Sequence, residues 1–142
     1  MAVAARPPGG LYTPAMLDAA VRLSAYPFDD AMLYKGEARS RSCGSVISVS
    51  LELDELGRIA RLGLRPHACA VGQAAASLFA SDASGSTRSE IAAARTAIAS
   101  WLAGEEPQPD WPGIALIEPA LAYPARHAAI LLAWDAALAA MP

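Results

Sequence analysis

Apolar and polar residues alternate between Ser45 and Leu64, and this period of two indicates half-buried strands. One face of the first strand carries Ile47, Val49, Leu51 and Leu53, and the other carries Ser48, Ser50 and Glu52. Asp54 to Gly57 has the composition of a turn, and the alternation resumes with Ala60, Leu62 and Leu64. The pattern therefore predicts a hairpin, and the entry of its first strand should meet the exit of its second at one end of the sheet.

Past His67 the period changes from that of a strand to that of a helix. Small and apolar residues crowd together from Ala70 to Ala80, which is typical of a packed helix that ends around 81–86. Thr13 followed by Pro14 predicts the start of an earlier helix, which should stop near Tyr26. Between these helices, the segment 32–34 is predicted as a short strand and the segment 36–42 as a polar loop.

The C-terminal half is predicted to be helical. Thr87-Arg88-Ser89-Glu90 has the sequence of a capping box and should open a helix. A loop rich in proline and acid is expected over 104–113, followed by a helical turn or two over 114–122 and a last helix that begins at Pro124. A short antiparallel sheet followed by a run of helices is an α+β plan, with helices packed against the sheet. We expect a flexible arm over residues 1–12 and a single domain over 13–142.

Composition narrows the function classes. The chain has 142 residues, a net charge of −3 and a pI near 5.3, so it lacks the basic surface that nucleic acid requires. No apolar run approaches the ~20 residues of a membrane span. Two cysteines in an acidic chain do not make a disulfide framework. These features predict a cytoplasmic protein with reduced thiols, without a nucleic-acid or membrane partner.

Three residues are the strongest candidates for chemistry: Cys43, Cys69 and His127. Cys69 should lie at the N-terminus of a helix, where free backbone N–H groups and the helix dipole favour a thiolate. Cys43 precedes the first strand of the hairpin, so the two thiols should meet at one end of the sheet. Thiolates and imidazole are the usual ligands of zinc and iron. No CxxC pair is present, so two ordinary small core cysteines remain the alternative.

The two histidines and the polar residues near them can also be explained without a metal-binding role. His127 falls on the apolar face of the last helix and is either a ligand at its first turn or a hydrogen-bonded core histidine. His67 flanks Cys69 in an extended segment, or else it is exposed at the rim. Ser45 and Arg126 are candidates for a secondary role beside the thiols. No acid–base pair of carboxylates, phosphate-binding loop or Ser-His-Asp signature is found in the sequence.

From about Leu11 to Leu138 the sequence resembles the U-type iron–sulfur cluster assembly scaffolds, the family of IscU and the NifU N-terminal domain. Cys43-Gly44-Ser45 before an alternating strand looks like the family's first cysteine motif. Ala68-Cys69-Ala70 and its small-residue helix are similar to the second. The segment 129–134 aligns with the segment that begins at the third cysteine, but Ala129 stands at the cysteine position, and Ser45 replaces an aspartate.

The resemblance implies a three-stranded antiparallel sheet with helices packed against it, as in the SufE and NifU folds. It also implies an iron–sulfur cluster that is built at one end of the molecule, with sulfur from a cysteine desulfurase, and passed to acceptor proteins. With Ala129 in place of a thiolate, His127 is the expected third ligand, and a four-ligand cluster needs an outside donor from a partner, a second subunit of a homodimer or a small thiol.

The sequence thus predicts a scaffold-like protein that is not itself an enzyme and binds iron, zinc or a labile cluster through Cys43, Cys69 and His127. Two alternatives remain open. One is a persulfide-accepting sulfur carrier that works with a desulfurase. The other is a structural zinc-binding relative without a cluster function.

Overall fold

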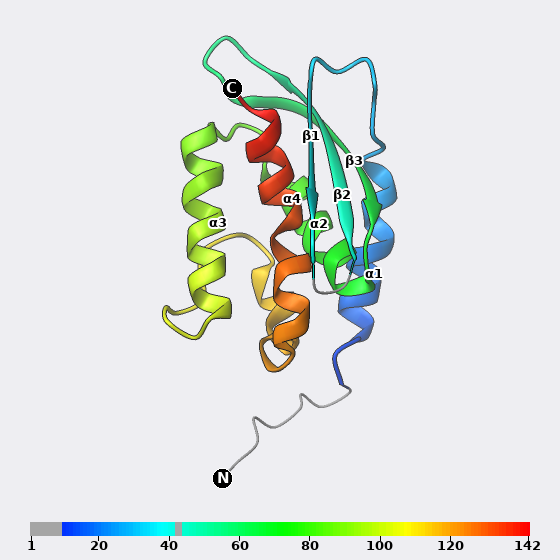
Figure 1. Ribbon diagram of the computed structural model, residues 1–142, viewed down its shortest axis with the longest axis vertical. Coiled ribbons are helices and arrows are strands. Elements are labelled where there is room, and N and C mark those ends of the chain that lie inside the picture. Colours follow the sequence, from blue (N-terminus) through cyan, green and yellow to red (C-terminus); the bar gives the residue numbers. More distant parts are fainter. Residues whose placement is uncertain (1–9, 42–43) are drawn as a thin grey trace.

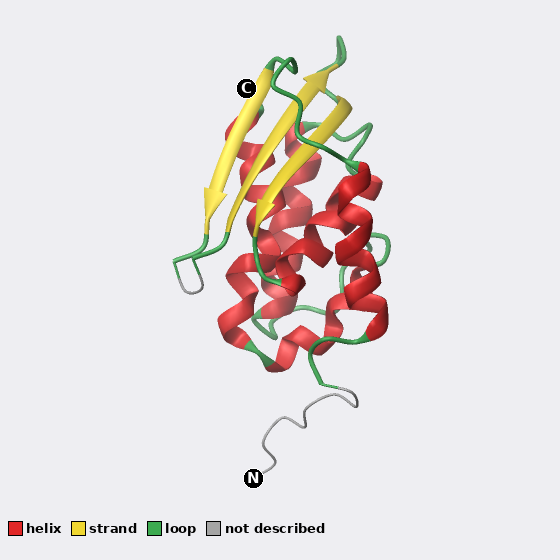
Figure 2. Cartoon of the chain, turned by 90° about the vertical axis from the view of Figure 1, so that its right-hand side faces the viewer, coloured by secondary structure: helices red, strands yellow, loops and turns green. Residues whose placement is uncertain are grey.

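The computed structural model describes residues 10–41 and 44–142. Its elements follow in the order α1 (Pro14–Arg22), η1 (Leu23–Ala25), β1 (Tyr34–Arg39), β2 (Val46–Leu53), β3 (Ile59–His67), α2 (Ala70–Asp82), α3 (Arg88–Leu102), η2 (Ile114–Ala122), η3 (Pro124–Arg126) and α4 (His127–Ala140). The strands form one antiparallel sheet in the order β1-β2-β3. Figure 2 shows the sheet as a single layer with the helices against one side of it. This is the predicted α+β fold, and its sheet has the predicted number of strands.

The predicted hairpin is present, and its register sets the geometry of the site. Val46 at the start of β2 pairs with His67 at the end of β3, so the two ends do meet. Ile47, Val49 and Leu51 are fully buried beneath the helices, as the alternation predicts. A register shift between Glu52 and Leu53 interrupts the pairing near the turn, and beyond it Ala60 is exposed instead of facing the core.

The prediction for the segment before the hairpin was wrong. The strand β1 covers Tyr34–Arg39, where a polar loop was expected, and only its first residue lies in the predicted strand. Exposed charged residues alternate along β1 with half-buried ones, and two of these, Gly36 and Ala38, are small, so its sequence carries little apolar signal. Gly36 has a structural reason: a Cβ atom there would overlap the carbonyl oxygen of Ala136 in α4. Close approach of α4 to the sheet therefore requires glycine at this position.

The helices form the other layer, with α4 against β1 and β2 and α2 between α1 and α4 (Figure 1). The predicted starts of α1 and α3 are confirmed, whereas the last helix, expected from Pro124, begins at His127 as α4, after the short 3-10 helix η3. Thr13 accepts a hydrogen bond from the Met16 N–H at the start of α1, and the Thr87–Glu90 capping box opens α3. Because α2 and α4 lie inside the molecule, both are apolar on most sides and are rich in buried alanine.

Trp111 packs against the core and anchors the predicted loop over 104–113. Its indole Nε1 donates a hydrogen bond of 2.9 Å to the carbonyl oxygen of Leu78. Its ring lies 6.1 Å from the ring of Phe79 and 5.2 Å from the ring of Trp134, measured between centroids. Edge-to-face and offset ring pairs of this kind stabilise a core beyond their area of burial. The loop is therefore packed at its C-terminal end although it has no regular structure.

The packed chain begins earlier than predicted. Leu11 is 7% exposed and belongs to the hydrophobic core, although the expected arm extended to residue 12. A single apolar residue before a helix start carries no periodic signal, which explains why the sequence pattern did not include it in the domain. Residues 1–9, which make up most of the expected arm, lie outside the described part of the chain.

Candidate functional site

Cys69 is the N-cap residue of α2, at the junction between β3 and the helix. The strand ends at His67, and Cys69 keeps an extended backbone with φ −63° and ψ 166° before the helix begins. The Gln73 side chain donates a hydrogen bond of 2.8 Å to the carbonyl oxygen of Ala68, which fixes this junction. Cys69 is half-buried and carries a free thiol. The change of period in the sequence thus located the junction correctly.

A cavity of about 440 Å³ opens beside Cys69. It is lined by Gly44, Ser45, Pro66, His67, Ala68, Cys69, Gln73 and Arg126. These residues come from the start of β2, the end of β3, the first turn of α2 and the segment just before α4. Three residues that the sequence singled out as secondary candidates, namely His67, Ser45 and Arg126, share this cavity with Cys69. Gln73 was not singled out, because a glutamine inside a small-residue helix gives no signal in the sequence.

The described lining of this cavity is cationic. Arg126 and His67 are its basic residues, and no carboxylate is among the described residues that line it. The N-terminus of the 13-residue helix α2 adds the positive end of a helix dipole at the same place. Such surroundings suit an anionic ligand or a metal centre bound by thiolates, because both bring negative charge to the cavity.

Cys43, the other predicted thiol, lies outside the described residues. The residues that follow it, Gly44 and Ser45, line the cavity beside Cys69. Gly44 has a positive φ of 69°, a conformation that glycine adopts at little cost. Among the described residues, no group of three or more His, Cys, Asp or Glu side chains is arranged to hold a metal ion. The metal-binding role of Cys43 and Cys69 therefore stays a prediction.

His127 is the first residue of α4, and its ring makes a specific contact. Its Nε2 donates a hydrogen bond of 3.0 Å to the carbonyl oxygen of Ala120 in η2. In the neutral form of the ring, that bond places the proton on Nε2, so Nδ1 is the nitrogen with a lone pair. Metal-binding histidines usually make such a bond with their second nitrogen. His127 does not line the cavity, whereas its neighbour Arg126 does, so a role as ligand stays a prediction.

Ala129 occupies the position at which the resemblance places the third cysteine. It is fully buried in the first turn of α4. A Cβ atom added at Gly72 in α2 would lie 3.4 Å from the Ala129 Cβ and 3.0 Å from the Ala68 Cβ. The position is therefore next to the turn that carries Cys69, and only small residues at 72 and 129 allow the two helices to approach so closely.

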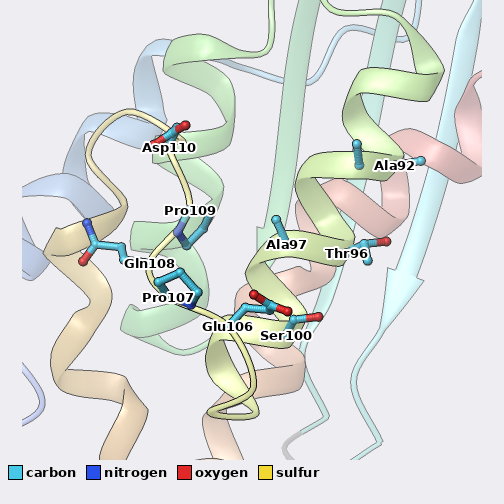
Figure 3. Close-up of a pocket in the computed structure, with 10 residues that line it drawn as sticks. Ala92, Thr96, Ala97, Ser100, Glu106, Pro107, Gln108, Pro109 and Asp110 are labelled. Atoms are coloured by element: carbon cyan, nitrogen blue, oxygen red, sulfur yellow. The ribbon is translucent and has the colours of Figure 1, made fainter.

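A larger cavity of about 780 Å³ lies between α3 and the loop that follows it (Figure 3). Small side chains of α3 such as Ala92 and Thr96 form one wall, and Pro107 and Pro109 lie on the other. The polar groups of its lining include Glu106 and Asp110, but no cysteine or histidine. It holds none of the predicted site residues, so the cavity at Cys69 is the candidate site.

Comparison with solved structures finds the same fold in proteins of known type. A NifU-like protein (N-terminal) from Brucella abortus, described as nitrogen-fixing, is 30% identical with a TM-score of 0.83, and the match covers 92% of this chain and 91% of that one. A protein assigned as an iron–sulfur cluster assembly scaffold of the SUF system, from Fervidobacterium islandicum, is 20% identical with a TM-score of 0.79. That match covers 89% of this chain and 93% of the other. No protein-family model matches the chain, and no curated protein gives a significant match.

These structures define the class: the chain has the fold of the U-type scaffold proteins. The identity and coverage of the Brucella match are high enough to go further. The chain belongs to the NifU-like N-terminal family. This is the family that the cysteine motifs in the sequence resemble. In the described part of the chain, no helix has the length and apolar character needed to cross a membrane.

Proposed function

We propose that this protein is an iron–sulfur cluster assembly scaffold that holds iron, or a labile cluster, as its cargo at the end of the sheet near Cys69. The observation that carries the proposal is the position of Cys69, which is a half-buried free thiol at a helix N-cap and borders a cavity without a described carboxylate lining. The family supports it, since a relative of the same fold is assigned as a cluster assembly scaffold. Thiolate ligands and a cationic surround suit a cluster whose iron is held by sulfur.

The proposed ligands are Cys43, Cys69 and His127. Cys69 supplies a thiolate from the helix N-terminus, and Cys43 supplies the second from the segment just before Gly44. His127 supplies Nδ1, because its Nε2 is engaged with the Ala120 carbonyl oxygen. Arg126, His67 and Ser45 lie beside this set and balance its charge or hydrogen-bond its sulfur atoms. Zinc suits the same ligands as a resting occupant, since cysteine and histidine are its usual donors.

In this proposal the protein is not itself an enzyme. A cysteine desulfurase delivers sulfur, and acceptor proteins remove the finished cluster, while the scaffold holds the intermediates in the cytoplasm. The thiol Cys69 is half-buried but borders an open cavity, which is the exposure that a donor and an acceptor both need. A homodimer is compatible with this role where a second copy supplies the missing ligand.

A second candidate function is that of a sulfur carrier. It is favoured by the position of Cys69, a half-buried free thiol at a helix N-cap that borders a cavity. A single nucleophilic thiolate is sufficient to accept a persulfide. A structural zinc site without a cluster function is the remaining alternative.

The deciding experiment is anaerobic purification followed by measurement of iron, acid-labile sulfide and zinc per chain. Iron with equivalent sulfide supports the scaffold, and Cys69→Ala should abolish both while Ser81→Ala, an exposed change at the far end of α2, should not. A persulfide on Cys69 after incubation with a desulfurase and cysteine, without bound metal, would favour the carrier. Zinc that iron and sulfide cannot displace would favour the structural site and contradict the scaffold.

A further inference from the structure

The outward side of α1 carries two large apolar residues one turn apart. Leu17 is 45% exposed and Val21 is 72% exposed, whereas Met16 and Ala19 on the inward side of the same helix are fully buried. The helix lies at the outer edge of the helical layer (Figure 1). A surface helix normally carries polar residues on its outward side, and neighbouring exposed apolar side chains are typical of a contact surface. Helix α1 therefore has a second apolar side, which no described segment of the chain covers.

An apolar cavity of about 380 Å³ opens beside Val21, on one flank of this outward side. Its lining joins the C-terminal end of α1 and η1 to β3 and includes Ala20, Val21, Leu23, Leu64 and Pro66. Leu17 does not belong to this lining, so its exposed side chain is free to fill a cavity of the same kind on another molecule. An exposed apolar side chain and an open apolar recess on the same helix are the two halves of a contact that a second copy completes.

The opposite flank of α1 carries two charges of opposite sign. Asp18 and Arg22 are both exposed and form an i,i+4 ion pair, with 3.5 Å between Asp18 Oδ2 and Arg22 Nε. With 3.6 residues per turn, these two side chains lie on one side of Val21, and Ala20 and Ser24, which line the cavity, lie on the other. The charges run from negative to positive along the chain, so an antiparallel copy of the same helix presents them in the complementary order.

We propose that α1 packs against α1 of a second copy of this chain, with the two helices antiparallel and a two-fold axis near Ala20. A two-fold axis at that position keeps each flank of the helix next to the same flank of the other copy. Asp18 then faces Arg22 of the partner subunit, and Arg22 faces the partner subunit's Asp18. On the other flank, Leu17 reaches the level of Leu23 of the partner subunit, where the apolar cavity of that copy opens. The contact thus contains two charge pairs and two leucine side chains in apolar cavities.

The contact is small, and it borders the candidate site. A helix of 9 residues covers less than the ~800 Å² per partner of a standard interface, so the dimer should be weak, with a Kd on the order of 10 μM. The cavity beside Val21 shares Pro66 and Gln73 with the cavity at Cys69, so a second copy bound at α1 stands at the rim of the Cys69 cavity. None of the residues that form the contact is a proposed ligand, so the dimer does not depend on metal or cluster binding.

Sedimentation equilibrium of the full chain over about 1–500 μM, a range that brackets the expected Kd, measures the association. A chelator and a reductant are present, so neither a bridging metal nor a disulfide contributes. The wild-type mass should rise from 14.7 kDa toward that of two chains. Val21→Asp should raise the Kd by about tenfold or more, equal to about 1.4 kcal/mol, because an apolar side chain of the contact becomes a charge. Leu56→Asp, at a residue that is 70% exposed in the turn between β2 and β3, is the matched control and should leave the Kd unchanged.

Charge reversal tests the antiparallel geometry. Asp18→Arg and Arg22→Asp each place like charges opposite one another twice in the contact, so each variant alone should self-associate about tenfold more weakly. A one-to-one mixture of the two variants should form a mixed dimer at least as tight as the wild-type dimer, because every pair across the contact is then opposite in charge. An exposed ion pair stabilises a single copy only slightly, so both variants should remain folded, which circular dichroism verifies.

Three results would refute this contact. Wild-type protein that stays monomeric over the whole concentration range overturns the inference, and so does a dimer whose Kd is the same in Val21→Asp and in the wild type. A dimer that Val21→Asp weakens, but that the mixture of charge variants does not restore, overturns the antiparallel arrangement. All three results leave the proposed function standing, because the measurement of iron and sulfide tests it separately.

Discussion

Replacing Ala129 by cysteine should convert the site into a better metal-binding site. The position lies in the first turn of α4 and faces the first turn of α2, which carries Cys69 at its cap. A thiolate at 129 would therefore add a third sulfur donor to the proposed set. Ala133→Cys is the matched control, since Ala133 is equally buried one turn further along α4 but belongs to the main core.

The expected change in zinc affinity is the free energy gained from the added ligand minus the cost of packing a larger side chain. Structural zinc sites with four ligands bind with about 10–16 kcal/mol, which is roughly 3 kcal/mol for each ligand. The added sulfur must fit where a Cβ atom at Gly72 would already lie 3.4 Å from the Ala129 Cβ. Overpacking of a tight core costs about 1–3 kcal/mol. With the middle of that cost, about 2 kcal/mol, the net gain should be about 1 kcal/mol, or roughly a fivefold increase in zinc affinity.

The assay is competition for zinc against a chromophoric chelator, with the thermal midpoint measured on the same samples. Ala129→Cys should bind zinc more tightly while its metal-free form unfolds at a lower temperature. Ala133→Cys should lose stability by a similar amount with no gain in affinity. Equal gains in the two variants, or no gain in a folded Ala129→Cys protein, would refute the placement of the third ligand at this position.

Three further predictions test the site and the fold. His127→Ala should lower metal affinity by at least as much as Cys69→Ala does, and His67→Ala should lower it by less. His127→Ala should also lower the free energy of unfolding by about 1 kcal/mol, because the hydrogen bond to the Ala120 carbonyl oxygen is lost. Unchanged metal affinity in His127→Ala would show that His127 is purely structural. The backbone N–H and then the hydroxyl of Thr87 hold the pKa of Glu90 below its ordinary value. The stability from this capping box should therefore be present above the ordinary glutamate pKa of about 4.3 and be lost as pH falls through the lower folded value, and in Glu90→Gln the acid slope of the melting temperature should flatten. Deletion of residues 1–9 should leave the melting temperature unchanged. Deletion through Leu11 should lower the free energy of unfolding by about 2 kcal/mol, because a buried core side chain is removed. Equal effects of the two deletions would contradict the boundary at Leu11.

The sequence predicts best where one local pattern decides the structure. The alternation in β2 and β3 predicted the hairpin, and the capping box at Thr87 predicted the start of α3, because side chains and hydrogen bonds within a few residues determine both. The sheet edge β1 was placed too early in the sequence, since its small and charged residues reflect the close approach of α4 at Gly36 and not a local preference. Contacts between distant segments leave no period in the sequence.

The same distinction applies to the candidate site. The position of Cys69 at a strand–helix junction was predictable from the change of period. The sharing of one cavity by Arg126 and His67 depends on how η3 and α4 dock against α2, and only the structure shows it. The ring of His127 was recognised as a candidate, but its bond to the Ala120 carbonyl oxygen joins two helical segments that the sequence predicts separately.

The contact between Trp111 and Trp134 gives the protein a built-in optical probe. The two indole rings lie 5.2 Å apart at an interplanar angle of 76°. Aromatic rings held this close in a fixed, chiral arrangement couple their electronic transitions and produce strong near-ultraviolet circular dichroism. Trp111 belongs to the loop after α3, and Trp134 belongs to α4 beside the sheet. The signal should vanish when the loop detaches from the core, even while the helices and their far-ultraviolet spectrum persist.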